Sequence, residues 1–353
     1  MNIIDKLRNN RLRIKEKFGN SYYRQLLRLG KTLIKSPRSS LRNGILKVMI
    51  GLTYECQCSC KYCCSGLYAK EKKKELTTEE IKSLIDSISH FPFAVVLVSF
   101  FGGEPLIRKD VFDLIKYAAT KGLFVELETN GILLSLENVK RLKVAGLHHL
   151  FVRIEHSDSE FHDQISSFKE CFKKAIEGIK HCVTERLSCS ISTIAMKEKI
   201  YNGQIKKIIE LGKKLKVTSL RILYPTLAGK WLDENEKILS KAEERTVREL
   251  LNPDFVYLES SYVCTREMNR ICPSKQKKMF YISCYGEVLP CPFVPLIFGN
   301  IRHKKISEIL EKMWLNPFLN YTDCSECLMH DVKFRNTYID HNELNAQYPL
   351  EIK

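Results

Sequence analysis

Short apolar segments alternate with longer amphipathic segments through most of the chain, and this alternation limits the folds that it can adopt. Thr77 and Glu80 form a capping-box pattern at the start of the first amphipathic segment. Six strand–helix units predict a parallel sheet with right-handed crossovers, either a barrel or an open doubly wound sheet. The expected strands are residues 46–54, 95–101, 124–128, 150–155, 188–194 and 219–224, and the expected helices are residues 78–89, 111–120, 136–144, 168–183 and 202–215.

A run of cysteines follows the first expected strand directly. Three residues separate Cys56 from Cys60, and two separate Cys60 from Cys63. Functional sites in α/β folds collect on loops that leave the carboxyl ends of strands. Three thiolates on one loop can hold three irons of a 4Fe–4S cluster, whereas electron carriers bind all four irons through Cys. The fourth iron is therefore expected to stay open for a small molecule. A three-cysteine zinc site would be an incomplete set.

Further motifs in the chain resemble those of the radical S-adenosylmethionine (SAM) superfamily. Tyr62 is an aromatic residue just before the last cysteine, Gly102-Gly103-Glu104-Pro105 follows the second strand, and Thr129-Asn130-Gly131 ends the third. The resemblance implies an α/β fold with a partial (β/α)6 barrel, in which the open iron binds SAM. It also implies reductive cleavage of SAM to methionine and a 5′-deoxyadenosyl radical, which abstracts a hydrogen atom from the substrate.

The same resemblance suggests which residues contact SAM. Gly102, Gly103 and Glu104 would receive the SAM ammonium, since glycines let the backbone approach a ligand closely and carbonyl and carboxylate oxygens suit a cation. Tyr62 would lie near the adenine, and Asn130 would lie within the SAM site.

The match to the superfamily weakens after the fourth strand. Many relatives with a C-terminal cluster domain read Ser-x-Asp-Gly there, whereas this chain has Arg153 and Glu155 at the first and third positions. Arg153 is expected to pair with the SAM carboxylate, and Glu155 to accept from ribose hydroxyls. His162 belongs to a His-Asp pair that is common in this group, and both a structural and a functional role are open for it.

A second cysteine set lies in the C-terminal part of the chain. It comprises Cys272, Cys291, Cys324 and Cys327, with an expected hairpin between the first two. Four Cys in two pairs are also a frequent zinc arrangement. The pattern resembles the auxiliary-cluster domain called twitch, a short form of the SPASM domain, which implies a second 4Fe–4S cluster.

The number of auxiliary clusters follows from the cysteines that remain. The longer SPASM domain continues with further Cys, but no Cys follows Cys327 in this chain. One auxiliary cluster is therefore expected, with electron transfer as its role. Cys264 and Cys284 are the alternative ligands for it.

The net charge of +16 is spread unevenly along the chain. Residues 1–43 contain twelve Lys or Arg and two acids, so they carry +10 of it. Residues 21–35 have the pattern of a basic amphipathic helix. This helix could pack on the barrel, lie peripherally on an anionic membrane surface, or contact a polyanionic partner. Because the rest of the chain carries only +6, nucleic-acid binding is not expected.

The sequence divides into five expected regions. They are a basic extension (1–44), a radical SAM core (45–229), a helical bridge (230–262), an auxiliary-cluster domain of α+β type (263–335) and a polar tail (336–353). The chain has no apolar run long enough for a spanning helix and no signal-peptide pattern. Fourteen Cys in such a chain fit a reducing cytosol, so the expected location is cytoplasmic, either free or at the inner membrane face.

These observations predict a radical SAM oxidoreductase-type enzyme that abstracts hydrogen from a peptide, sugar or lipid-linked substrate. A low-potential protein such as flavodoxin or ferredoxin would supply the electron. The alternatives are a non-enzymatic iron–sulfur carrier or scaffold, and a radical SAM core with a structural zinc domain.

The amphipathic pattern of residues 21–35 generates a first prediction. Burial of the apolar stripe at an interface would contribute several kcal/mol at roughly 25 cal/mol per Å², and four cations beside an anionic leaflet would add about 1 kcal/mol each. Together these suffice for reversible attachment. The full-length protein should therefore cosediment with anionic liposomes at low salt and much less at high salt, and a variant beginning at Gly44 should stay in solution. Equal sedimentation of the two proteins would contradict membrane contact.

Overall fold

The computed structural model describes most of the chain after the basic extension. The extension, including residues 21–35, lies outside the described residues, and so do Cys264 and Cys324. The described residues are 44–65, 73–93, 95–252, 254–259, 272–319, 327–340 and 349–352.

Seven parallel strands form the body of the sheet, and they are neighbours in the order in which they occur in the chain. The six expected strands are confirmed, each within two residues of its expected bounds. Nearly every residue of these strands is buried, as in parallel sheets covered on both faces. The seven strands are β1 (Ile45–Thr53), β2 (Val95–Gly102), β3 (Phe124–Thr129), β4 (His149–Arg153), β5 (Cys189–Ile194), β6 (Ser219–Leu223) and β7 (Val256–Leu258).

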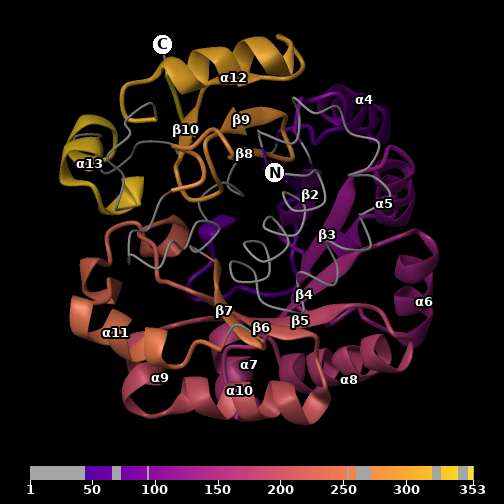
Figure 1. Cartoon of the computed structure of the whole chain (residues 1–353), viewed down its shortest axis with the longest axis vertical. Coiled ribbons are helices and arrows are strands. Elements are labelled where there is room, and N and C mark those ends of the chain that lie inside the picture. Colours follow the sequence, from indigo (N-terminus) through magenta and orange to yellow (C-terminus); the bar gives the residue numbers. More distant parts are fainter. Residues whose placement is uncertain are drawn as a thin grey trace, which may run out of the picture.

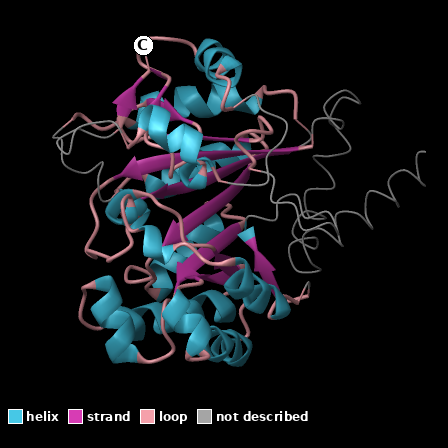
Figure 2. Ribbon diagram, turned by 90° about the vertical axis from the view of Figure 1, so that its left-hand side faces the viewer, coloured by secondary structure: helices cyan, strands magenta, loops and turns pink. Residues whose placement is uncertain are grey.

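Helices surround the strands on the outside of the molecule (Figures 1 and 2). The predicted capping box is confirmed, since the side chains of Thr77 and Glu80 each accept from the other's backbone N–H. Two helices of this part were not expected, α7 and α9, and each is joined to the preceding strand by a short loop. The helices of this part are α4 (Thr78–Ser89), α5 (Val111–Thr120), α6 (Leu136–Val144), α7 (Ser159–Ser166), α8 (Cys171–Thr184), α9 (Lys197–Tyr201), α10 (Gln204–Leu215) and α11 (Lys241–Glu249).

Ion pairs across the interior demonstrate that the sheet is curved into a partial barrel. Neighbouring strands lie about 4.8 Å apart, so a flat sheet would separate β1 from β7 by about 29 Å. Nevertheless, Lys47 Nζ on β1 lies 2.8 Å from Glu259 Oε1, directly after β7, and 3.7 Å from Glu126 Oε2 on β3. Arg221 on β6 contacts Glu259 and Glu128. The open doubly wound alternative is therefore excluded.

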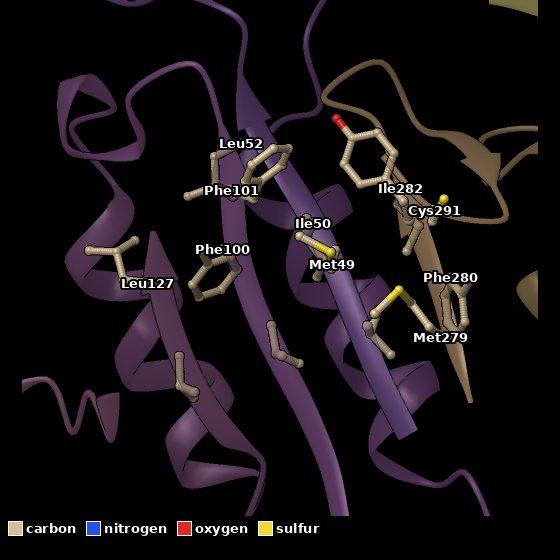
Figure 3. Packing of buried hydrophobic residues seen from close by; sticks show 14 of the residues in the cluster. Met49, Ile50, Leu52, Phe100, Phe101, Leu127, Met279, Phe280, Ile282 and Cys291 are labelled. Atoms are coloured by element: carbon tan, nitrogen blue, oxygen red, sulfur yellow. The ribbon is translucent and has the colours of Figure 1, made fainter. Parts of the chain in front are cut away.

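The C-terminal hairpin extends the same sheet. Strand β8 (Met279–Ile282) pairs in parallel with β1, and β9 (Glu287–Leu289) pairs antiparallel with β8. Apolar side chains of β1, β2 and β8, including Ile50, Phe100 and Phe280, pack into one core (Figure 3). The remaining elements are β10 (Leu296–Ile297), β11 (Gly299–Asn300), α12 (Ile306–Leu315), α13 (Val332–Tyr338) and β12 (Leu350–Glu351).

The expected regional boundaries do not coincide with breaks in this sheet. The 230–262 segment was expected to be a helical bridge, but besides α11 it supplies β7, because Val256 and Leu258 bury their side chains beside β6. The expected polar tail begins inside α13, and its β12 pairs with β10. Core and C-terminal part therefore share one sheet in the described residues.

None of the described helices has the length and apolar character needed to cross a membrane.

The interior ion pairs generate a prediction about stability. Burial lowers the pKa of Lys47, but the carboxylates of Glu259 and Glu126 outweigh it and raise the pKa above its usual range. Lys47→Met should lower the free energy of unfolding by about 3–5 kcal/mol at pH 8, because it leaves the buried Glu126 carboxylate unpaired and removes one of the two cations beside Glu259. Urea unfolding under anaerobic conditions measures this loss. The exposed pair of Lys121 with Asp86 supplies the control, Lys121→Met, which should cost far less than Lys47→Met because water and salt screen an exposed ion pair.

The loss in Lys47→Met should shrink as the pH falls. Burial raises the pKa of Glu126 to about 7, so this carboxyl takes up a proton as the pH falls through that value. Once Glu126 is protonated and neutral, replacing Lys47 no longer leaves its charge buried and unpaired, so the variant loses less free energy of unfolding. An equal loss at pH 5.5 and pH 8 would contradict this role of the ion pair.

Candidate active site

The predicted site segments meet at one edge of the sheet. The cysteine loop follows β1, Gly103 and Glu104 follow β2, and Asn130 follows β3. In a parallel sheet, the carboxyl ends of neighbouring strands lie at the same edge. The structure therefore brings together three motifs that are separated by up to 74 residues in the chain.

Glu104 joins these motifs through its side chain, which is completely buried. Its Oε1 accepts from Thr129 Oγ1 at 2.8 Å and from the Leu106 N–H at 3.1 Å, and its Oε2 accepts from the Asn130 N–H at 2.8 Å. Burial raises the pKa of this carboxyl to about 7, and the three donors act in the opposite direction. The carboxylate thus fixes the loop after β3 to the loop after β2.

Gly102 and Gly103 lie against the start of the cysteine loop. The Gly103 N–H donates to Thr53 O at 2.7 Å, and the Glu104 N–H donates to Glu55 O at 2.8 Å. A Cβ on Gly103 would overlap Glu55 O, and Gly102 has a φ of +130°. Glycine is therefore required here for close packing within the protein.

The loop cysteines are surrounded by hydrogen-bond donors. The Asn130 amide donates to Cys56 Sγ at 3.7 Å and to Gln57 Oε1 at 3.2 Å. The Cys58 thiol, its N–H and the Asn130 amide together lower the pKa of Cys56 to about 6. Hydrogen bonding by Cys58 and the charge of Arg153 also lower the pKa of Cys60, whereas burial raises that of Cys63. Thiolate is the form that binds iron, so these donors favour the ligand state at two positions.

Helix α7 supports the cysteine loop from one side. The Ser59 N–H donates to Ser166 O at 3.0 Å, and the Lys61 N–H donates to Ile165 O at 3.3 Å. His162 is buried in the same helix, and its Nδ1 accepts from the Glu155 N–H at 3.1 Å. His162 thus holds the chain where it leaves β4.

The segment after β6 supports the loop from another side, and no pattern in the sequence predicts this. The Lys230 N–H donates to Cys63 O at 3.2 Å, and Lys230 Nζ donates to Ser59 Oγ at 3.0 Å. The Trp231 ring packs edge-on against Tyr62, with ring centroids 5.8 Å apart. The three residues Gly229-Lys230-Trp231 do not by themselves predict a contact with the cysteine loop.

Arg153 and Glu155 lie next to Tyr62 at the end of β4. Arg153 Cζ is 5.2 Å from the centroid of the Tyr62 ring, and its Nη1 is 3.6 Å from Glu155 Oε1. Glu155 Oε2 accepts from Lys199 Nζ at 2.5 Å and from the Ile194 N–H at 3.0 Å. Burial opposes ionisation of Glu155, but the Lys199 ammonium outweighs it and lowers the pKa. Lys199 is a site residue that the sequence did not reveal.

Three of the four C-terminal cysteines lie near one another. Burial raises the pKa of Cys291, and the neighbouring thiols of Cys272 and Cys327 raise it further. The fourth, Cys324, lies outside the described residues. Cys284 is buried elsewhere, where Glu75 and Glu287 act on its thiol.

The donor chemistry of both cysteine sets fits iron–sulfur clusters, which thiolates hold. Among the described residues, no three His, Cys, Asp or Glu side chains form a group that could hold a single metal ion.

Two family models match the chain. The model of the radical SAM superfamily matches residues 50–214, and that of an iron–sulfur cluster-binding domain, SPASM, matches residues 272–328. The second match includes all four C-terminal cysteines and favours an iron–sulfur cluster over zinc.

Curated relatives cover most of the chain. An AdoMet-dependent heme synthase of Methanosarcina barkeri is 28% identical over 287 residues, which are 74% of this chain and 80% of that protein. A PqqA peptide cyclase of Bradyrhizobium diazoefficiens is 28% identical over 314 residues, 82% of this chain and 80% of that protein.

Solved structures share the fold. SuiB of Streptococcus suis, bound to its precursor peptide SuiA, has a TM-score of 0.61 at 16% identity, and the match covers 84% of this chain and 69% of SuiB. A structure of anSMEcpe with bound AdoMet has a TM-score of 0.59 at 17% identity and covers 76% of this chain and 80% of that one.

The family matches and the relatives, which are named as enzymes, exclude a simple electron carrier. SAM and 4Fe–4S clusters are accordingly the cofactors. The chain is a radical SAM enzyme with a C-terminal iron–sulfur cluster-binding domain.

Proposed function

We propose that this enzyme carries out an oxidative modification that begins with hydrogen abstraction from a peptide. The observation that carries the proposal is the convergence of Cys56, Glu104 and Asn130 at the end of a charged barrel interior. With SAM and a reduced cluster bound, one electron from the cluster would cleave SAM to methionine and the 5′-deoxyadenosyl radical that abstracts the hydrogen atom. A low-potential protein such as flavodoxin or ferredoxin is the proposed electron donor.

Cys56, Cys60 and Cys63 are the proposed cluster ligands. Because the Glu104 side chain is engaged by three internal donors, the backbone of Gly102 and Gly103 is the proposed acceptor for the SAM ammonium.

The remaining proposed SAM contacts lie around Tyr62. Its ring is proposed to contact the adenine. Arg153, whose side chain is 27% exposed, is proposed to pair with the SAM carboxylate. Among the described residues, the buried Glu155 Oε1 has no hydrogen-bond partner and lies 3.6 Å from Arg153 Nη1, so it is proposed to orient Arg153 or to accept from a ribose hydroxyl. The side-chain amide of Asn130 is proposed to keep its hydrogen bond to Cys56 in the cluster loop.

The C-terminal domain is proposed to hold one auxiliary 4Fe–4S cluster on Cys272, Cys291, Cys324 and Cys327. Four protein ligands would leave no iron for substrate, so its proposed role is to accept the electron that a two-electron oxidation releases.

Two observations support the proposal of a peptide substrate: the names of two relatives, and the charged side chains of the barrel interior. Two relatives are named for peptides, the PqqA peptide cyclase and the SuiA-bound SuiB. Among the described residues, Glu128, Arg153 and Glu259 are charged groups of the interior whose side chains are partly exposed. They suit the polar groups of a peptide better than the apolar faces of a tetrapyrrole, the second candidate, which the heme synthase relatives suggest.

The loop cysteines generate a prediction about SAM cleavage. Cys56→Ala, Cys60→Ala and Cys63→Ala should each abolish formation of 5′-deoxyadenosine, because each removes an iron ligand. The measurement is chromatography of reaction mixtures after anaerobic reconstitution and reduction. Cys64→Ala is the matched control and should retain cleavage. Retained cleavage in the Cys60 variant would contradict the ligand assignment.

The two cysteine sets generate a prediction about iron content. The wild type should contain about eight irons per chain, the sum of two 4Fe–4S clusters. Removal of the three loop cysteines together should leave about four, by the same stoichiometry. Metal analysis of anaerobically prepared protein measures both, and zinc in place of the second four irons would contradict the auxiliary cluster.

A further inference from the structure

Gly229 packs directly against the cluster loop. Its φ is +58°, and a Cβ there would overlap Cys63 O and lie 2.5 Å from Cys64 Cα. The Lys230 N–H also donates to Cys63 O. A displacement of this segment, residues 229–233, must therefore displace the cluster loop.

Arg335 holds the other end of segment 229–233. Its Nη1 donates to Leu232 O at 3.0 Å, and its Nη2 lies 3.6 Å from Asp233 Oδ1. Asp340 fixes the guanidinium from behind, accepting from Nη2 at 2.6 Å and from Nε at 3.3 Å. The Arg335 side chain is only 8% exposed, and a paired, buried guanidinium has a defined geometry.

Arg335 is connected to the auxiliary site by a short, well-packed run of chain. It lies on α13, eight residues after Cys327. The His330 N–H donates to Cys327 O at 2.9 Å, and the Arg335 N–H donates to Asp331 O at 2.9 Å. Leu328, Met329 and Phe334, which lie within this run, are buried.

From these contacts we infer that Arg335 is a positioning residue for the SAM-cluster loop. It acts through the carbonyl of Leu232 and segment 229–233 on Cys63, and it links the loop to the chain that carries Cys327. Among the described residues, Arg335 itself forms no hydrogen bond or ion pair with the cysteines. The inference rests on the proposed cluster ligands, but its primary test does not require SAM chemistry.

The test measures alkylation of individual cysteines in the full-length, cluster-free protein by iodoacetamide and mass spectrometry. Arg335→Gln should raise the rate at Cys63 by about tenfold or more, since loss of a hydrogen bond to a charged group favours local opening. Cys182 and Cys189, buried between α8 and β5, report unfolding elsewhere, and their rates should not change. Arg335→Lys retains the charge and should give an intermediate rate at Cys63.

Arg302→Gln is the matched control. Arg302 also connects the C-terminal part to the core, through Glu80 and the carbonyls of Lys74 and Glu75. Among the described residues, it forms no hydrogen bond or ion pair with segment 229–233. The Cys63 rate should therefore stay within about twofold of the wild type in this variant, as for substitutions that do not open the region locally.

A second readout uses the reduced enzyme with its clusters. Addition of SAM alters the electron paramagnetic resonance signal of the cluster that binds it, and Arg335→Gln should change that response while the auxiliary iron is retained. Should Arg335→Gln fail to fold, Gly229→Ala displaces the same loop and should raise the Cys63 rate as well. An unchanged Cys63 rate in folded Arg335→Gln, or an equal increase in Arg302→Gln, would overturn the inference.

Discussion

The active-site edge of this enzyme depends on one buried carboxylate. Glu104 accepts hydrogen bonds from Thr129 Oγ1 and from the Leu106 and Asn130 N–H groups, so a single side chain fixes the loops after β2 and β3. Its own N–H is bound to Glu55 O, immediately before the first cysteine. Removal of such a carboxylate would leave buried donors without acceptors, which costs far more than the loss of an exposed contact.

The charged interior of the barrel is the second constraint, and it joins the ends of the sheet. Lys47, Glu259 and Arg221 connect β1 to the chain after β7 and to β6, where no backbone pairing between the described strands closes the barrel. Strand β8 occupies the free edge of β1 instead. The C-terminal domain is thereby attached to the strand that leads into the cysteine loop.

Local signals in the sequence were sufficient for six of the seven parallel strands, for most helices and for the motifs, but not for β7. The capping box at Thr77 and the apolar run of β1 depend on near neighbours in the chain, and so both could be predicted. The pairing of β8 with β1 joins residues more than 230 positions apart, and no local pattern specifies it. Gly229 and Lys199 were missed for the same reason, because their roles arise from residues brought near by the fold.

SAM affinity in a Glu104→Gln variant tests most directly whether this carboxylate organises the site. Gln has nearly the same size as Glu, but one of its two terminal groups is an NH2 donor. This donor would face at least one of the three hydrogen-bond donors from which Glu104 now accepts. Titration of the reduced, cluster-loaded protein with SAM, followed by electron paramagnetic resonance, should give affinity lowered by about tenfold or more, with the iron content retained. Glu79→Gln, at an exposed carboxylate on α4, should bind SAM as the wild type does. Unchanged affinity in Glu104→Gln would contradict the account.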